Sequence, residues 1–433
     1  MAAAEPDRDG HAATLGSAAG RGQASGTDLI RADEEFHPAG AQRSDPRGHG
    51  AGLRTPGGDA GPVAHYREPM PSSVPVVSVL GATGRTGRLV IGGLQPEEVR
   101  LRLIGRSGSA LTTLAADVGP GTETAVLAGI DADQVAGAIA GSDLVLNLAG
   151  PFTATAPVVA NAAIGADASY IDIANERPAI AALYGLSALA VRAGVSLLPA
   201  SGYGTVTTEG LAVWLAGGNA MRRVDLGLLP WTAGTSAGAL ESVLEGLATG
   251  AARVRNGQYE RARLGSGAAP LTLPDGRRVT LVPGDLGDLA TLPAGYGTPD
   301  VTASVGVALA PLLARTLLPA VSGVMRSTAL RFRLSAAGGG GRRPPSRERS
   351  SYSWARVTLA DGEVREGWLT AGEGYAFTAD AVLAAVRRTL SGDALPGTST
   401  AIRAFGPEFL EALPGVRLER VLPHLSGTPG RED

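Results

Sequence analysis

Seven residues, Gly81 to Gly87, have the types and the spacing needed to hold a phosphate group. They read Gly-Ala-Thr-Gly-Arg-Thr-Gly and lie between the apolar run Val76 to Leu80 and the start of an expected helix. Gly81 permits a tight turn, Gly84 lets the backbone approach a pyrophosphate, and Gly87 lets the helix lie close to the sheet. Unpaired N–H groups at the helix N-terminus would bind the phosphates. The expected ligands of a dinucleotide are Gly81, Thr83, Gly84, Arg85, Thr86 and Gly87.

The end of the second expected strand indicates which dinucleotide binds. An Asp or Glu roughly 20 residues after the glycine loop is typical of NAD enzymes, because it binds the adenosine ribose. This chain has Gly105-Arg106-Ser107 there and offers no carboxylate. Arg106 and the Ser107 hydroxyl would instead form charge-assisted hydrogen bonds with a 2′-phosphate. The pattern favours NADP(H), and the alternative is an ordinary solvated arginine at a strand end.

Two further loops are expected at the same edge of the sheet, where ligands of such sheets bind. Ala149, Gly150 and Pro151 follow the fourth strand and would pass beside the cofactor. Asp172 and Glu176 surround the end of the fifth strand. These two carboxylates either face the cleft between domains and act in catalysis, or cap and hydrogen-bond the following helix. The sequence leaves both interpretations open.

These loops are placed by a regular alternation of apolar strands and helices between residues 73 and 202. The pattern predicts an α/β domain with a Rossmann-type, doubly wound parallel sheet. The expected strands are Val76 to Leu80, Val99 to Ile104, Thr124 to Leu127, Asp143 to Leu148, Ser169 to Ile173 and Val195 to Leu198. The expected helices are Thr86 to Leu94, Ser109 to Val118, Asp131 to Ala140, Ala156 to Gly165 and Pro178 to Ala193.

A second α+β domain with a mostly antiparallel sheet is expected over residues 203–375, for substrate binding or dimerisation. Two Asp-Gly turns, Asp275-Gly276 and Asp361-Gly362, predict hairpins that pair Leu271 to Leu273 with Arg278 to Val282 and Trp354 to Leu359 with Glu363 to Leu369. The apolar segment Val301 to Met325 is interpreted as a helix pair that lines a hydrophobic pocket or a subunit interface, because Pro311, Arg315 and Pro319 interrupt it and argue against a membrane span.

The sequence predicts different structures for the two ends of the chain. Residues 1–72 are dense in Gly, Ala, Asp, Arg and Pro without apolar periodicity, so a disordered tail is expected, with folding beginning near Met70. Residues 376–433 are expected to form C-terminal helices that return to the Rossmann domain.

Composition limits the chemistry and the partners. A net charge of −3 with 18% charged residues favours a small-molecule substrate and no nucleic acid. The chain has no cysteine and no lysine, and its histidines are confined to the two ends (His11, His37, His49, His65 and His424). Disulfides, thiolate catalysis, cysteine-based metal sites and Schiff-base chemistry are thereby excluded, and we expect no metal. A cytoplasmic location is the default, and a homodimer is possible.

With these motifs in view, the chain resembles the saccharopine dehydrogenase-like NADP-binding oxidoreductases, a family that includes trans-acting enoyl reductases. The resemblance extends from about Val76 to Leu413. In the first expected domain it rests on the glycine loop at residues 81–88, on Gly105-Arg106-Ser107, on residues 149–152 with 157–159, and on Tyr170-x-Asp172-x-x-x-Glu176. Further along the chain, the matching motifs are residues 202–204 with Thr208-Glu209, residues 234–235, Gly374-Tyr375-x-x-Thr378-Ala379 and Pro396-Gly397-x-x-Thr400. Gly202-Tyr203-Gly204-Thr205 differs from the Gly-Phe-Asp-Ser that is usual in the enoyl-reductase branch.

The resemblance implies an NADPH-dependent reductase that transfers hydride to a polarised C=C, C=O or C=N bond of a hydrophobic small-molecule or lipid-like substrate. Without Lys, Cys or a central His, the proton donor must be Tyr, Asp, Glu or water. Tyr203, just past the last strand, is the main candidate beside Asp172 and Glu176, and a packing role for Tyr203 is the alternative. Two other functions remain open. One is a saccharopine-type amino-acid dehydrogenase, with Arg263, Arg277 and Arg278 available for carboxylates; the other is a non-catalytic NADP(H) sensor or scaffold.

Overall fold

A computed structural model of the protein describes residues 74–230, 237–327, 330–331, 333–334 and 350–421. The expected tail at residues 1–72 lies outside the described residues, as do Gly234 and Thr235. Among the described residues, no helix combines the length and the apolar character needed to cross a membrane.

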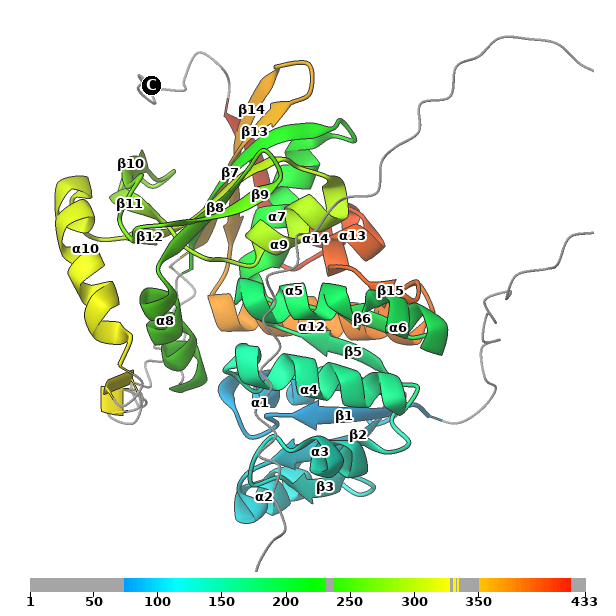
Figure 1. The fold of residues 1–433 in the computed structure, drawn as a ribbon. Helices are drawn as coiled ribbons and strands as arrows, with labels where there is room; N and C mark the ends of the chain where they lie inside the picture. Colours follow the sequence, from blue (N-terminus) through cyan, green and yellow to red (C-terminus); the bar gives the residue numbers. More distant parts are fainter. Residues whose placement is uncertain (1–73, 231–236, 328–329, 332, 335–349, 422–433) are drawn as a thin grey trace, which may run out of the picture. The chain divides into compact units, whose positions relative to one another are not determined.

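The first domain contains a parallel sheet of seven strands in the order β15-β6-β5-β4-β1-β2-β3 (Figure 1). Its strands are β1 (Val76–Leu80), β2 (Arg100–Gly105), β3 (Glu123–Val126), β4 (Leu144–Asn147), β5 (Ser169–Asp172), β6 (Ser196–Leu198) and β15 (Gly397–Thr398). The associated helices are α1 (Arg85–Gly93), α2 (Gly108–Val118), α3 (Ala132–Ile139), α4 (Phe152–Gly165), α5 (Arg177–Gly185), α6 (Ser187–Ala193) and α12 (Gly374–Leu390). The predicted doubly wound parallel sheet is confirmed, with β15 added from near the C-terminus.

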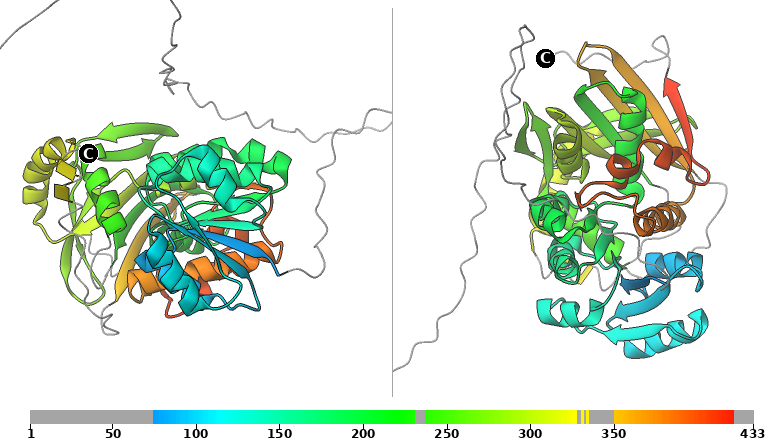
Figure 2. Two further views of the ribbon diagram at one scale, coloured as in Figure 1. Left: turned by 90° about the horizontal axis from the view of Figure 1, so that it is seen from below. Right: turned by 90° about the vertical axis from the view of Figure 1, so that its right-hand side faces the viewer.

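Both faces of this sheet are covered by apolar side chains. Along β4, Leu144 and Leu146 belong to one hydrophobic cluster and Val145 belongs to another, because successive strand residues point to opposite faces. One cluster contains α1 and α12, which pack on each other, and the other contains α3, α4 and α5. Figure 2 shows the helices on both sides of the sheet. Such two-sided burial explains why these strands are apolar runs.

The second sheet is mixed and mainly antiparallel. Its path is β10-β11-β12-β7-β13-β14-β16, with the hairpin β8–β9 attached to β12, and only the β12–β7 pair is parallel among its described pairs. Its strands are β7 (Met221–Leu229), β8 (Ala251–Arg255), β9 (Gln258–Ala262), β10 (Ala269–Thr272), β11 (Arg278–Pro283), β12 (Asp300–Val307), β13 (Ser351–Leu359), β14 (Val364–Ala371) and β16 (Arg417–Val421). Both predicted hairpins are present, as β10–β11 and β13–β14.

The helices around this sheet are α7 (Tyr203–Ala216), α8 (Ala237–Thr249), α9 (Asp288–Tyr296), α10 (Pro311–Met325), α13 (Ala401–Phe405) and α14 (Glu408–Glu411). Buried α7 packs against β7, β13 and β14. Its cluster of apolar residues is continuous with one face of the first sheet, since Leu211 and Val224 belong to the same cluster as Val77. One hydrophobic core therefore joins the two sheets.

Two of the predicted elements are wrong. The segment Val301 to Met325 is strand β12 followed by helix α10, rather than a helix pair. The β-branched residues of Val301-Thr302-Ala303-Ser304-Val305 favour a strand, and Pro311 begins the helix because proline suits a first helical turn. The single helix expected from Pro178 to Ala193 is interrupted at Leu186, where the Leu186 N–H bonds to the Leu183 carbonyl in a tighter turn after Gly185.

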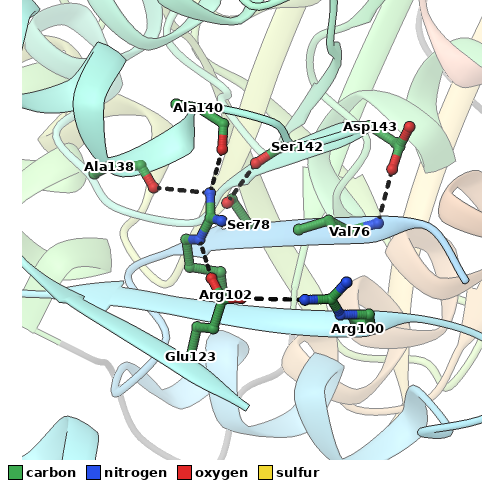
Figure 3. Close-up of polar contacts among 9 residues, drawn as sticks. All are labelled: Val76, Ser78, Arg100, Arg102, Glu123, Ala138, Ala140, Ser142 and Asp143. Carbon is green, nitrogen blue, oxygen red and sulfur yellow. Dashed lines mark hydrogen bonds and ion pairs between the residues drawn. The ribbon is translucent and has the colours of Figure 1, made fainter. Parts of the chain in front are cut away.

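Polar contacts fix the first three strands and α3 in place (Figure 3). Arg102 donates to Glu123 on β3 at 2.8 Å and to the carbonyl of Ala140, at the C-terminal end of α3, at 2.7 Å. A cation at this position complements the helix dipole. Arg100, on the same strand, is also paired with Glu123, at 3.3 Å. Both arginines of β2 are thus used within the protein.

Candidate functional site

The glycine loop and the loop after β4 meet where the direction of the sheet reverses. Strands β1 and β4 are neighbours, but the chain continues from β1 to β2 and β3 on one side and from β4 to β5 and β6 on the other. The crevice outside the carboxyl ends at such a point is where these folds bind ligands. Gly81 has φ +82°, and a Cβ there would lie 2.8 Å from the Leu148 carbonyl oxygen. Only glycine allows the two loops to approach this closely.

The turn itself leaves a helix N-terminus open to a ligand. The Gly84 N–H bonds to the Gly81 carbonyl at 2.9 Å, and exposed Gly84 caps α1 without a side chain. The N–H groups of the first helical turn therefore have no partner within the helix. A Cβ at Gly87 would lie 2.4 Å from the Gly81 carbonyl oxygen, so α1 can start here only with glycine. This cradle fits a pyrophosphate, and Thr83 and buried Thr86 lie within it.

Arg106 and Ser107 lie next to this cradle. A Cβ at Gly105 would be 3.8 Å from the Thr83 hydroxyl oxygen, which places the end of β2 beside the glycine loop. Arg106 is exposed, and within the described part of the chain its guanidinium has no hydrogen bond or ion pair. The Ser107 hydroxyl accepts from the Ala110 N–H at 3.4 Å and caps α2. Both residues thus lie beside the glycine loop, at the end of β2.

Arg85 is already engaged by the C-terminal half of the chain. Its guanidinium forms an ion pair with Glu373 at 3.1 Å and lies 4.1 Å from the centre of the Tyr375 ring. Glu373 also caps α12 by accepting from the N–H groups of Tyr375 and Ala376. Glu373 is a neighbour of the glycine loop that the sequence did not reveal, since it lies 288 residues from Arg85.

The buried side chain of Asn147 holds the loop formed by Ala149, Gly150 and Pro151. The side-chain oxygen of Asn147 accepts from the Ala149 N–H at 3.2 Å, while its amide nitrogen donates to Thr155 and to Tyr170, both at 3.1 Å. The Thr155 hydroxyl in turn donates to the Ala149 carbonyl at 2.7 Å. The loop is therefore rigidly placed at the crevice beside Gly81.

Asp172 lies inside the protein. Its carboxylate accepts from the Ala174 N–H at 2.9 Å, the Ala200 N–H at 2.8 Å and the Tyr170 hydroxyl at 2.8 Å. Burial raises the pKa of Asp172 to about 6 in spite of these donors. With no exposed surface and with three donors, this carboxylate fixes the loops after β5 and β6. The geometry favours the structural interpretation over a catalytic one.

Tyr203 is also enclosed. Its hydroxyl donates to the Tyr352 carbonyl at 2.9 Å, and its ring makes an edge contact with Phe377 at 5.4 Å between centroids. Burial raises the pKa of the phenol well above its ordinary value. A proton donor must reach its substrate, and this hydroxyl faces the backbone of β13 instead. The location suits the packing alternative.

Glu176 is the one of the three predicted acid–base residues that keeps part of its surface exposed. Glu176 precedes α5, and its carboxylate accepts from the Asn175 N–H at 2.9 Å. Its backbone forms an isolated antiparallel β-bridge with Leu286 of the second domain. Beside it lies a cluster that sequence reasoning missed. Arg177 pairs at 2.6 Å with Asp285, whose side chain is 3% exposed, and Tyr259 donates to Asp285 at 3.0 Å. These partners come from β9 and the loop after β11, so no local pattern could have identified them.

The fold and the crevice together define a dinucleotide-binding Rossmann protein with a second, α+β domain. Residues 77–196 match the family model of the saccharopine dehydrogenase NADP binding domain. Residues 77–196 thus form a domain of the saccharopine dehydrogenase NADP-binding type, as the motifs predicted, and the cofactor of this domain is a nicotinamide dinucleotide.

Solved structures share the fold of both domains. Apo saccharopine dehydrogenase (L-Glu forming) from Saccharomyces cerevisiae is 17% identical, with a TM-score of 0.54 over 80% of this chain and 100% of that one. Homospermidine synthase from Legionella pneumophila, in complex with NAD, is 8% identical, with a TM-score of 0.53 over 83% of this chain and 94% of that one. No curated protein matches the chain.

Proposed function

We propose that the chain is an NADPH-dependent oxidoreductase that transfers hydride to a polarised C=C, C=O or C=N bond of a hydrophobic small molecule. The observation that carries this proposal is the pairing of a glycine cradle with Arg106, an exposed arginine without a carboxylate neighbour at the end of β2. A bound NADPH supplies the hydride and is oxidised to NADP⁺, while a proton is taken up at the other atom of the reduced bond.

The chain's own residues would perform three tasks. The first turn of α1 and Gly84 bind the pyrophosphate, and Arg106 with Ser107 binds the 2′-phosphate. The loop from Ala149 to Pro151, held by Asn147, positions the reactive end of the cofactor. Glu176, partly exposed beside the carboxyl end of β5, supplies or relays the proton.

An amino-acid dehydrogenase of the saccharopine type would need several arginines directed at substrate carboxylates. Of the three arginines available in the sequence, Arg277 is already paired with Asp275 in the turn between β10 and β11, at 2.8 Å. Arg263 lines a cavity beside α10 instead. No hydrogen bond or ion pair among the described residues directs either of these two arginines at the cofactor crevice, and we therefore propose the reductase in preference to the amino-acid dehydrogenase.

Glu176→Gln tests the proton role, with Asp172→Asn as its structural counterpart. NADPH oxidation should be screened with enones, hydrophobic ketones and imines, and with imino dicarboxylic acids. We expect Glu176→Gln to lower kcat by about 100-fold with little change in melting temperature, since general acid catalysis contributes roughly 10²–10⁴-fold. Asp172→Asn should lower the melting temperature, because a neutral amide cannot serve all three donors equally. A Glu176→Gln variant with an unchanged kcat and pH profile would remove Glu176 from the mechanism, and turnover confined to imino dicarboxylic acids would favour the saccharopine-type alternative.

A further inference from the structure

A cavity of about 510 Å³ lies between the β8–β9 hairpin, the segment after it, and α10. Three arginines line it, namely Arg261, Arg263 and Arg326. In the part of the chain that the structure describes, none of their guanidinium groups has a hydrogen bond or an ion pair. An adjoining cavity of about 480 Å³ shares Arg261 and Arg326 and is also lined by Glu245 and Arg331. Because arginines outnumber carboxylates among the described residues that line the two cavities, the site has a net positive charge that favours an anion.

The walls of the cavity are built from fixed backbone rather than from a loose surface. Gly265 has φ +85°, and a Cβ there would lie 2.4 Å from the Ala314 carbonyl oxygen, so the segment after β9 is in close contact with α10. Arg315 of α10 donates to the Ala268 carbonyl at 2.8 Å and holds the same segment. The backbone segments that carry Arg263 and Arg326 are therefore held against each other.

The outer surface of α10 adjoins this cavity and is apolar. The cavity is lined on this side by Thr316, Pro319, Ala320, Ser322 and Gly323 of α10 and by Arg326 at its C-terminal end. Leu313, Leu317 and Val324 lie beyond the Ala320 edge of this face, roughly 20–60° further around the helix at about 100° per residue. Leu313 is 48% exposed, Leu317 50% and Val324 56%. At the start of the helix Leu312, one turn before Thr316, is 71% exposed. Contiguous exposed leucines of this kind usually mark a binding surface.

The charge of this region selects the partner. From Pro311 to Leu334 the sequence has no Asp or Glu and four arginines, in a chain of net charge −3. A second copy of the same face would bring like charges together, which is unfavourable. An anionic group with an apolar chain complements both the arginines and the leucines.

We propose that this surface is a second ligand site, which binds an anionic amphiphile. The acidic headgroup occupies the cavity of Arg261, Arg263 and Arg326, and the apolar chain lies on Leu312, Leu313 and Leu317. Binding at this site is separate from the proposed hydride transfer and requires no turnover, so it can be measured independently of that activity.

Calorimetric titration of the full chain with decyl phosphate below its micelle concentration tests the site. Inorganic phosphate and decanol are the matched probes that lack the chain or the charge. We expect decyl phosphate to bind at least about tenfold more tightly than either of them, because both parts of the molecule contribute. Equal affinities for decyl phosphate and inorganic phosphate, or for decyl phosphate and decanol, would overturn the proposal.

Variants locate the binding on the surface. The double variant Arg261→Gln/Arg326→Gln should lower the affinity for decyl phosphate by about tenfold or more, since two charge-assisted contacts are lost. Leu312→Ser/Leu317→Ser should remove the advantage of decyl phosphate over inorganic phosphate. Arg192→Gln/Arg255→Gln, which changes two exposed arginines elsewhere, should leave all affinities unchanged. If the two arginine variants lose affinity equally, binding is nonspecific charge attraction and the proposal fails.

A final comparison distinguishes a lipid headgroup from a free amphiphile. Vesicles of phosphatidylglycerol and phosphatidylcholine are sedimented with the wild type and with the Arg261→Gln/Arg326→Gln variant. If the wild type sediments with anionic vesicles, decyl phosphate releases it and the variant does not sediment, the site is supported and its ligand is a lipid headgroup. Binding of decyl phosphate without sedimentation supports the site with a soluble amphiphile as the source.

Discussion

At the scale of single residues, the carboxylates around an arginine decide whether it is available to a ligand. Arg100 and Arg102 on β2 share Glu123 (Figure 3). Arg106, just beyond the same strand, is exposed and has no such partner among the described residues. A negatively charged residue at the position of Arg106 would repel a 2′-phosphate, and an arginine attracts it. The discrimination between NADPH and NADH should therefore depend on this one side chain.

We expect the wild type to bind NADPH more tightly than NADH. Arg106→Ala should lower the affinity for NADPH by about tenfold or more, since a hydrogen bond to a charged group contributes roughly 1.5–3 kcal/mol. NADH affinity should be nearly unchanged. Arg100→Ala is the matched control, because it removes an arginine of β2 that is used in an ion pair. Fluorescence titration of both cofactors measures the effect. Equal affinities of the wild type for NADPH and NADH, or an equal loss of both in Arg106→Ala, would show that Arg106 does not bind the 2′-phosphate.

At the scale of elements, short contacts determine where helices can begin and what they can bury. Helix α1 starts against the carbonyl groups of Gly81 and Ala82, with Gly87 at the contact. Helix α9 begins with Asp288, whose carboxylate is buried and accepts from Thr208 of α7 at 2.6 Å. The first contact shapes the cofactor crevice, and the second ties two helices of the second domain together.

Gly87→Ala should displace α1 and lower the affinities for NADPH and NADH alike. The added Cβ would lie 2.4 Å from the Gly81 carbonyl oxygen and 2.7 Å from the Ala82 carbonyl oxygen. Gly92→Ala is the control in the same helix, since no atom lies within 4 Å of a Cβ there. It should raise stability by roughly 0.5–1 kcal/mol, because alanine favours the helix more than glycine does. Titration of both cofactors and thermal melting provide the measurements. Normal cofactor affinity in Gly87→Ala would contradict the importance of this contact.

The buried Asp288 predicts a pH dependence of stability. Burial, reinforced by nearby Glu209, raises its pKa to about 7, from 3.8 in the unfolded chain. A folded-state pKa above the unfolded value stabilises the protein fully below the unfolded pKa, and this contribution is lost as the pH rises through about 7. At pH 8 the unfolding free energy of Asp288→Asn should therefore exceed that of the wild type by on the order of a few kcal/mol, and this difference should shrink as the pH is lowered from about 7 toward 3.8.

Thermal melts of the wild type and Asp288→Asn across this pH range measure the effect. The matched control is Asp117→Asn, which changes an exposed carboxylate on α2 and should leave the pH profile unaltered. A constant difference between Asp288→Asn and the wild type at all pH values would mean that Asp288 does not titrate in this range.

At the scale of the whole molecule, the C-terminal part of the described chain supports both sheets. Strand β15 pairs with β6 at the edge of the first sheet, α12 packs on α1, and β16 pairs with β14 in the second sheet (Figure 1). The ion pair between Arg85 and Glu373 joins the glycine loop to the N-terminal end of α12. At the other end, the described backbone contacts begin with Pro75 and Val76, which bond to Arg100 and Asp143.

A shortened chain that begins at Met70 should keep the melting temperature and the cofactor affinity of the full chain. The removed residues 1–69 have a composition that offers no apolar core, and the first strand begins only at Val76. Thermal melting and NADPH titration of the two chains provide the comparison. A decrease of several degrees in melting temperature would show that the N-terminal residues contribute to folding.

The sequence alone was sufficient for features that depend on neighbouring residues. The apolar strand, the spacing of Gly81, Gly84 and Gly87, and the absence of a carboxylate after Ile104 predicted the parallel sheet and its nicotinamide dinucleotide, because turn geometry and strand burial are local properties. Asp-Gly turns predicted the two hairpins for the same reason.

Only the tertiary structure decided which side chains remain accessible. Tyr203 is enclosed because Tyr352 and Phe377, at distant positions in the chain, pack against it, and Asp172 is saturated by the Ala200 N–H and the Tyr170 hydroxyl. The unpaired arginines beside α10 likewise come together from β9 and the end of that helix. Burial and charge pairing depend on contacts between residues far apart in sequence, and no local pattern contains that information.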